Sequence, residues 1–252
     1  GPDRPTNPNY GDGMYRRRIR LRQLGDRVTG ELEDDCHGFR VVVHHDGIEV
    51  TGVTAETPRV PLTTCSGAVR PLRELVGTRL DTPPPGIVAA VDPRANCTHL
   101  YDLALLAIGH GLREGERRYD VEVLDQPREG GTARAEVFLD GDSVHRWELE
   151  WTTIAEPTEL AGRPVLQGFA AWANQAFKGV EQEAAFVLSK GVFVSMSRLY
   201  DMENVAGNSA LDNEWMRGVC YSYSDGVMER AQYLGTNTRD FTNSPEMLLK
   251  FR

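Results

Sequence analysis

Between residues 17 and 55 the sequence largely alternates between apolar and polar side chains, and this period-2 pattern constrains the fold more than any other feature. It predicts four strands in succession, with no helical pattern between them: Arg17–Leu24, Arg27–Glu33, Phe39–His45 and Gly47–Ala55. The Asp-Gly pair in His45-Asp46-Gly47 favours a tight turn, so we expect the last two strands to form a hairpin. Strands joined by tight turns are antiparallel.

Helical patterns come mostly in blocks after the strands. From Cys97 to about His110 the apolar residues recur at spacings of three and four, which predicts a helix with one face in the core and Asn96 as its N-cap. A shorter helix is expected between Cys65 and Val76. The remaining predicted elements are strands at Tyr119–Leu124, Ala133–Leu139 and Val144–Ile154, helices at Leu166–Phe177 and Gln182–Tyr200, and a short strand leading into a helix over residues 218–234.

Strands and helices in separate blocks indicate the α+β class: an antiparallel sheet of hairpins packed with helices, with a helical C-terminal part. We divide the chain into three parts. Residues 1–14 are expected to be a flexible leader or tag remnant, residues 15–155 an α+β domain, and residues 156–252 a mainly helical part that either joins this domain or forms a second one.

Charge and hydropathy narrow the possible partners. The 252-residue chain has a formal net charge of −9, which argues against a nucleic-acid-binding protein. Its one basic cluster, Tyr15–Arg22, alternates arginine with apolar residues and is expected to be a solvated or acid-paired strand face. No apolar run approaches the ~20 residues of a membrane span, and no secretory leader is visible, so the expected location is the cytoplasm.

Cys97 and His99 stand where a helix is predicted to begin. The positive end of a helix dipole lowers the pKa of a thiol, and Asp102, three residues after His99, can orient its ring. Cys97 and His99 could therefore serve nucleophilic or acid–base chemistry. The alternative is that Cys97 fills the core and His99 caps the helix.

A second candidate lies in the segment "EDDCHGF", where Asp35 and His37 share one face if the chain is extended. A carboxylate beside an imidazole fixes its tautomer, as a general base requires. The alternative is a polar turn in which Asp34 and Asp35 cap backbone groups. Arg59, held between two prolines, suits recognition of a carboxylate or phosphate, or a structural salt bridge.

The four cysteines are far apart in the sequence and form no CxxC pair, which favours reduced thiols over a disulfide framework. The only local pairs of metal-binding residue types are Cys-x-His and Cys-His. Because zinc sites usually show tight pairs such as CxxC or HExxH, no metal and no other cofactor is predicted.

The segments "LEDDCHGFRVVVHHDG", "TPRVPLTTCSGAVRPLRELVG" and "CTHLYDLALLA" together resemble a bacterial family known as domain of unknown function 2889, from about residue 15 to about residue 110. The segment "GVCYSYSDGVMERA" resembles the end of that family more loosely, and Leu62 stands where an aromatic residue is expected. The resemblance implies that eight residues belong to one composite pocket: Asp35, His37, Arg59, Cys65, Cys97, Thr98, His99 and Asp102.

These residues predict an enzyme that performs acid–base chemistry on a small organic acid or acyl substrate, of the lyase, hydratase, isomerase or cyclase type. His37, oriented by Asp35, would be the base, with His99 as acid or oxyanion donor and Cys97 as an optional nucleophile. The predicted substrate-binding residues are Arg59, Thr98, Asp102 and Cys65.

Two other functions stay open at this point. The first is a non-catalytic subunit or small-molecule-binding module, with the long apolar C-terminal helix as a homodimer or partner surface. The second is a metal-dependent enzyme that uses the Cys and His set.

Overall fold

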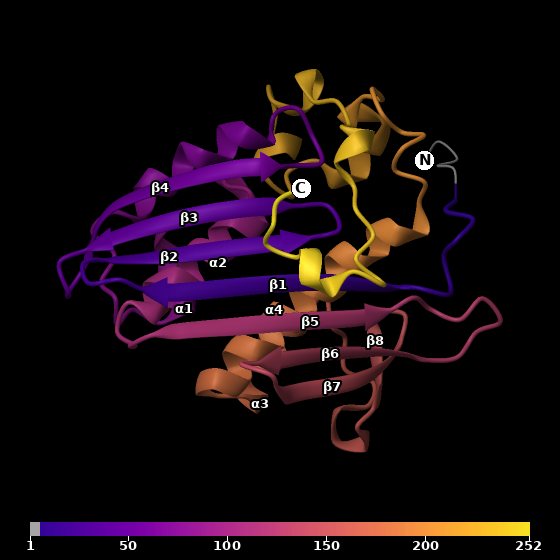
Figure 1. Ribbon diagram of the computed structural model, residues 1–252, viewed down its shortest axis with the longest axis horizontal. Coiled ribbons are helices and arrows are strands. Elements are labelled where there is room, and N and C mark those ends of the chain that lie inside the picture. The colour runs from indigo at the N-terminus through magenta and orange to yellow at the C-terminus, as the bar shows by residue number, and fades with distance from the viewer. Residues whose placement is uncertain (1–5) are drawn as a thin grey trace.

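The computed structural model describes residues 6–252, and these contain one antiparallel sheet of eight strands in the order β4-β3-β2-β1-β5-β6-β7-β8 (Figure 1). The strands are β1 (Met14–Gln23), β2 (Arg27–Asp34), β3 (Gly38–His45), β4 (Val50–Arg59), β5 (Glu116–Leu124), β6 (Ala133–Leu139), β7 (Asp142–Glu150) and β8 (Thr153–Glu156). Each strand pairs with its neighbours in antiparallel register, so the hairpin architecture predicted from the alternation is confirmed.

One face of the sheet carries the helices (Figure 1). The helices are α1 (Pro84–Ala90), α2 (Thr98–His110), α3 (Phe169–Ala176) and α4 (Gly179–Ser195). Helix α2 packs against β1, β2 and β3, whereas α4 packs against β1, β5, β6 and β7. The α+β class is therefore confirmed. The apolar residues of α4 that were a candidate dimer surface are largely buried against the sheet.

Alternation along β1 decides which side chains form the core. Tyr15, Arg17, Ile19 and Leu21 are buried, at most 3% exposed. The arginines between them lie on the opposite face and pair with acids of neighbouring strands, in the pairs Arg16–Glu122, Arg18–Asp120 and Arg20–Glu31. The basic cluster is thus an acid-paired strand face, as expected.

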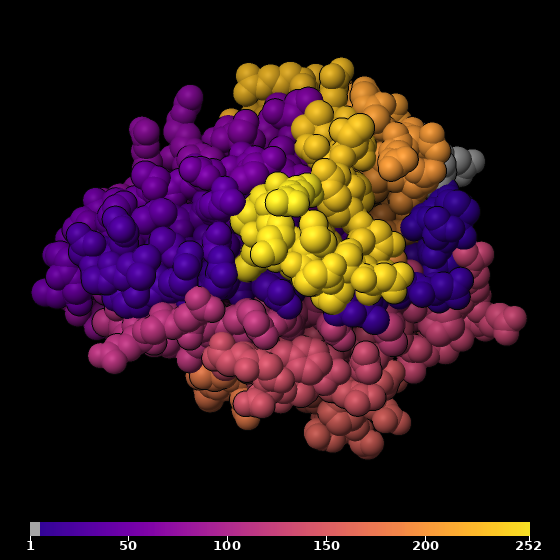
Figure 2. Space-filling view, in the orientation of Figure 1, coloured from indigo at the N-terminus to yellow at the C-terminus, as the bar shows by residue number. Residues whose placement is uncertain are grey.

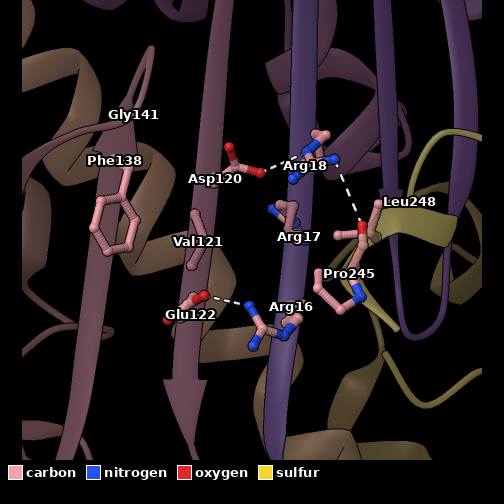
Figure 3. Close-up of a pocket in the computed structure, with 10 residues that line it drawn as sticks. All are labelled: Arg16, Arg17, Arg18, Asp120, Val121, Glu122, Phe138, Gly141, Pro245 and Leu248. Carbon is pink, nitrogen blue, oxygen red and sulfur yellow. Dashed lines mark hydrogen bonds and ion pairs between the residues drawn. The ribbon is translucent and has the colours of Figure 1, made fainter. Parts of the chain in front are cut away.

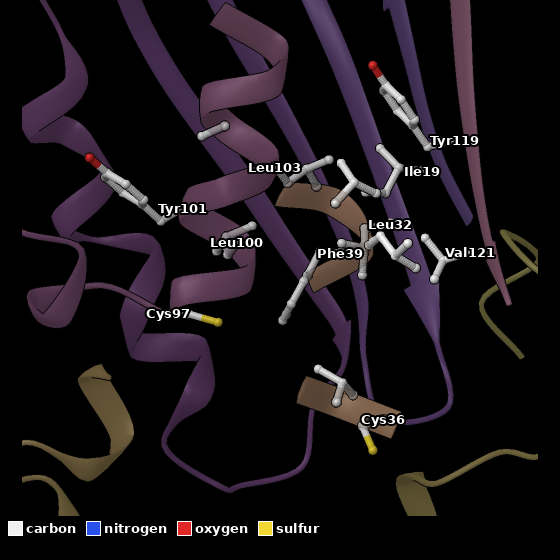
Figure 4. Packing of buried hydrophobic residues seen from close by; sticks show 14 of the residues in the cluster. Ile19, Leu32, Cys36, Phe39, Cys97, Leu100, Tyr101, Leu103, Tyr119 and Val121 are labelled. Atoms are coloured by element: carbon white, nitrogen blue, oxygen red, sulfur yellow. The ribbon is translucent and has the colours of Figure 1, made fainter. Parts of the chain in front are cut away.

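Helix α2 lies very close to the sheet because Gly30 has no side chain. A Cβ at that position would stand 3.2 Å from Leu103 of α2 and 2.9 Å from Val41 of β3. Figure 4 shows Leu100 and Leu103 of α2 among the apolar side chains of the strands. The helix begins one residue later than predicted. Cys97 is its N-cap, while the Asn96 amide donates to the carbonyl of Asp92.

Three predicted segments differ from the structure. The predicted strand 144–154 is two strands, β7 and β8, because the chain turns at Trp151, where φ is +55°. The short helix expected between residues 65 and 76 is a pair of 3₁₀ turns, Cys65–Val69 and Pro71–Leu75. The strand and helix predicted over residues 218–234 are wrong. That region forms the 3₁₀ turns Tyr221–Tyr223 and Met228–Arg230.

The two ends of the chain pack onto the sheet domain. Residues 1–5 of the predicted leader lie outside the described residues. In residues 6–13, the Asn7 backbone N–H donates to the carbonyl of Leu199, and Gly11 and Gly13 donate to Asp125. The last residues cross the face of the sheet opposite the helices (Figure 2). Among residues 6–252, no helix is long and apolar enough to cross a membrane.

Candidate functional site

The site begins at the tight turn between β2 and β3. Asp34 is the last residue of β2, and its fully buried carboxylate accepts hydrogen bonds from the backbone N–H groups of Cys36 at 2.8 Å and His37 at 2.7 Å. The same carboxylate lies 3.0 Å from Nδ1 of the His37 ring. An ionised carboxylate can only accept, so Nδ1 of His37 carries a proton and Nε2 is the nitrogen left to exchange one. A general base needs its ring held in this way.

Asp34 is kept ionised by its surroundings. Burial alone would raise its pKa, but the interactions with His37 and with the Arg17 cation outweigh burial and hold the pKa of Asp34 well below its ordinary value. The Arg17 guanidinium reaches Oδ2 at 2.7 Å, and the Tyr15 hydroxyl donates to the same oxygen at 2.8 Å. Because alternation turns Tyr15 and Arg17 of β1 toward the helices, both side chains arrive beside Asp34 from the neighbouring strand.

His99, near the start of α2, meets His37. The two ring centroids are 4.6 Å apart, and only 7% of His37 and 8% of His99 is exposed. Burial first, and then the electrostatic effects of His37 and of the Arg17 cation, lower the pKa of His99 well below its ordinary value. His99 is therefore neutral at neutral pH, and its buried Nδ1 has no hydrogen-bond partner. The structure brings together the two histidines that the sequence assigns to one site.

Helix α4 supplies the outer part of the site. The Phe193 ring stacks on His99 at a centroid distance of 6.3 Å and is 36% exposed. One turn earlier, Lys190 Nζ lies 3.1 Å from Oδ2 of Asp102 on α2. Neither Lys190 nor Phe193 was predicted from the sequence to belong to the site. The signal that could have found them is a lysine and a phenylalanine three residues apart in the otherwise small and aliphatic stretch "LSKGVFVS".

Asp35 does not orient His37, contrary to the prediction. Residues 34–37 form a tight turn rather than an extended segment, so the residue three positions before His37 reaches its ring and the residue two positions before does not. The Asp35 carboxylate is directed to Arg198 instead, at 3.0 Å. Burial outweighs this ion pair and raises the pKa of Asp35 to about 8.

The guanidinium of Arg59 binds the turn between β2 and β3, so its predicted role in holding a substrate carboxylate is not supported. Its guanidinium donates to the carbonyl oxygens of Asp34, of Asp35 at 2.9 Å and of His37 at 2.9 Å. It also pairs with Glu33 at 3.2 Å and is only 4% exposed. These contacts agree with the alternative prediction for Arg59, a structural salt bridge.

The two thiols of the predicted pocket lie in apolar surroundings. Burial raises the pKa of Cys97, in spite of its position at the start of a helix. Burial also raises the pKa of Cys65 to about 11, and this thiol accepts a hydrogen bond from the Ser222 hydroxyl at 3.3 Å. Both thiols are protonated at neutral pH, which removes the physical basis for a nucleophilic Cys97.

The last two predicted substrate-binding residues have different surroundings. Asp102 forms its ion pair with Lys190, and no hydrogen bond between Asp102 and His99 is formed. Thr98, the first residue of α2, is half-buried. Among residues 6–252, no three or more His, Cys, Asp and Glu side chains are arranged to hold a metal ion.

A separate shallow cavity of about 310 Å³ lies on the opposite face of the sheet (Figure 3). Arg16 and Arg18 line it together with Glu122 and Asp120, their ion-pair partners. The charges of these four side chains balance, so they favour neither an anion nor a cation there.

The histidine pair lies within a segment that matches a known protein family. Residues 22–109 match a family described as "Protein of unknown function (DUF2889)". This confirms the resemblance drawn from the motifs. The matched segment runs from the end of β1 to the end of α2, so it contains Asp34, His37 and His99. A search of curated proteins gives no match.

Proposed function

We propose that the chain is an enzyme that performs acid–base chemistry on a small organic acid or acyl substrate, with His37 as the general base. The observation that carries this proposal is the chain of contacts from the ionised Asp34 through His37 to the neutral His99. Relative to the sequence prediction, Asp34 replaces Asp35 as the group that orients the base.

The chemistry assigns a separate task to each residue. His37 takes a proton on Nε2, and the imidazolium that forms is stabilised by Asp34 at Nδ1. His99, as a neutral imidazole, can donate a hydrogen bond from one ring nitrogen and accept one on the other. The pair suits proton transfer next to a carbonyl, which is the common step of lyases, hydratases and isomerases. General acid–base catalysis of this kind is worth roughly 10²–10⁴-fold in rate.

A non-catalytic small-molecule-binding module is the second candidate. The near-complete enclosure of the two rings favours it, because burial limits the access of a substrate to their nitrogens. The metal-dependent alternative has no cluster of ligands to build on in residues 6–252.

Proton exchange with solvent tests for a working general base, whichever complete reaction that base serves. The purified protein is incubated in D₂O with a panel of small carboxylic acids and acyl thioesters, and deuterium incorporation is measured by mass spectrometry. We expect exchange at carbon for at least one compound, and a loss of about 10²-fold or more in His37→Asn and in His99→Asn.

The matched control is His44→Asn. His44 lies on β3 near the other end of that strand, half-buried and paired in register with Arg27. This variant should exchange at the wild-type rate, and thermal melting verifies that all three variants are folded. Wild-type exchange rates in folded His37→Asn and His99→Asn would contradict the proposal.

A further inference from the structure

Two side chains of α4 stand at the outer edge of the histidine pair and have no role in the proton transfer described above. The Lys190–Asp102 ion pair is about one-third exposed on both sides, at 36% and 34%. Phe193, three residues after Lys190, is exposed while its ring contacts His99. A cation and an exposed aromatic ring are therefore neighbours on one helix, beside a buried imidazole with an unpartnered nitrogen.

We propose that Lys190 and Phe193 are the substrate-recognition residues of this site, and that they select carboxylic acids with an aromatic or other bulky apolar body. This rests on the proposed function and deepens it. The substrate carboxylate pairs with the Lys190 ammonium, and its apolar body packs against the Phe193 ring, which places its reactive carbon toward His99 and His37.

The charges around the site single out Lys190 for this role. Arg17 forms an ion pair with Asp34, and Arg59 donates hydrogen bonds to carbonyl oxygens of the turn between β2 and β3. Both arginines are almost fully buried, at 2% and 4% exposure, and cannot reach a ligand without breaking those bonds. The Lys190 side chain is 36% exposed, and its charge is one of those that, after burial, lower the pKa of His99.

In the absence of substrate, the Asp102 carboxylate occupies the place beside the Lys190 ammonium that the substrate carboxylate would take. An ion pair with this much exposure is weak, so an incoming carboxylate can exchange with Asp102 on the lysine. Asp102 is available for this exchange because it faces Lys190 and not the ring of His99, which the sequence predicted it to orient. Removal of the Asp102 charge should therefore strengthen the binding of an acid rather than weaken it.

Benzoate is a suitable probe because it combines a carboxylate with an aromatic ring, and benzamide is its uncharged counterpart. Both are titrated into the full chain, and the ring signals of His37, His99 and Phe193 are followed by NMR. We expect benzoate to shift the His99 and Phe193 signals and to bind at least tenfold more tightly than benzamide. Lys190→Met should lose this tenfold advantage, whereas Asp102→Asn should bind benzoate several-fold more tightly than the wild type.

Lys178→Met is the matched control. Lys178 precedes α4 by one residue, and its ammonium donates to the carbonyl of Asn174, far along the helix from Phe193. Benzoate affinity equal to the wild type is expected for this variant. Benzoate that shifts neither ring at tens of millimolar, or that binds Lys190→Met as tightly as the wild type, overturns the recognition proposal.

The two proposals fail in different ways. If benzoate binds through Lys190 but no acid in the panel exchanges deuterium, recognition stands and catalysis by His37 does not. If deuterium exchange depends on His37 while benzoate binding is indifferent to Lys190, catalysis stands and the recognition proposal is overturned.

Discussion

Replacement of Asp34 by asparagine should destabilise the protein strongly, although it changes only one atom of the side chain. Asp34 is the single anion beside the Arg17 guanidinium, which is 2% exposed. Asparagine keeps the shape but leaves that guanidinium buried without a counter-charge. It also presents an amide N–H₂ where two of the donors to Asp34 now find an oxygen.

The size of the destabilisation follows from the burial of the Arg17–Asp34 ion pair. Removal of one partner from a buried ion pair costs about 3–5 kcal/mol in free energy of unfolding. The cost must depend on pH in a specific direction. Because the pKa of Asp34 in the folded protein lies well below its ordinary value of 3.8, Asp34 contributes stability above pH 4 that is lost as the pH falls through the folded-state pKa. The difference between wild type and Asp34→Asn should therefore shrink below pH 4.

Urea unfolding at neutral pH and at acidic pH measures both effects. Arg20→Gln is the control, because it breaks the partly exposed pair with Glu31 and should cost no more than about 1 kcal/mol. If Asp34→Asn stays within about 1 kcal/mol of the wild type at neutral pH, or if its cost does not fall in acid, the assignment of Asp34 as the buried anion of the site is refuted.

Three other predictions address the rest of the chain. Among the four thiols only Cys220 is partly exposed, so iodoacetamide should label it alone in the native protein. Rapid labelling of the other three, detected by mass spectrometry, would contradict their burial. Burial raises the folded-state pKa of Asp35 to about 8, above the ordinary 3.8. The contribution of Asp35 to stability is therefore complete below about pH 4 and is lost as the pH rises through 8, so Tm should fall over that range in the wild type but not in Asp35→Asn. The same Tm–pH profile for both proteins would contradict the raised pKa. A Cβ at Gly191 would stand 2.7 Å from Val121, so Gly191→Ala should cost about 1–3 kcal/mol, whereas Gly109→Ala meets nothing within 4 Å and should stabilise by about 0.5–1 kcal/mol in the same urea assay.

The sheet could be predicted from sequence because alternation and turn residues are local signals. The first three strands lie within three residues of their expected ends, and α2 begins one residue after its prediction. Residues 200–252 could not be predicted in the same way. Their 3₁₀ turns are held by bonds to distant segments, such as the Tyr221 backbone N–H to the carbonyl of Asn96 and Arg239 to that of Asp35.

The site was predictable in its two histidines but not in the groups around them. The prediction that Asp35 orients His37 assumed an extended backbone. The backbone forms a tight turn instead, and the turn brings Asp34 to the His37 ring. Tyr15 and Arg17 of β1 are near neither histidine in sequence and reach Asp34 only through the register of β1 with β2, in which Arg17 pairs with Asp34. Lys190 and Phe193 reach the site only because α4 places them beside Asp102 and His99 of α2, a contact between segments that are far apart in the sequence.

The central claim is that His37, held by Asp34 at Nδ1, faces His99. Long-range ¹H–¹⁵N NMR of the histidine side chains tests it without any substrate, because each tautomer has its own pair of nitrogen shifts. We expect a protonated Nδ1 for His37, a neutral His99 at neutral pH, and cross-relaxation between the two rings. A His37 protonated on Nε2 alone, or two rings with no cross-relaxation, would contradict the account.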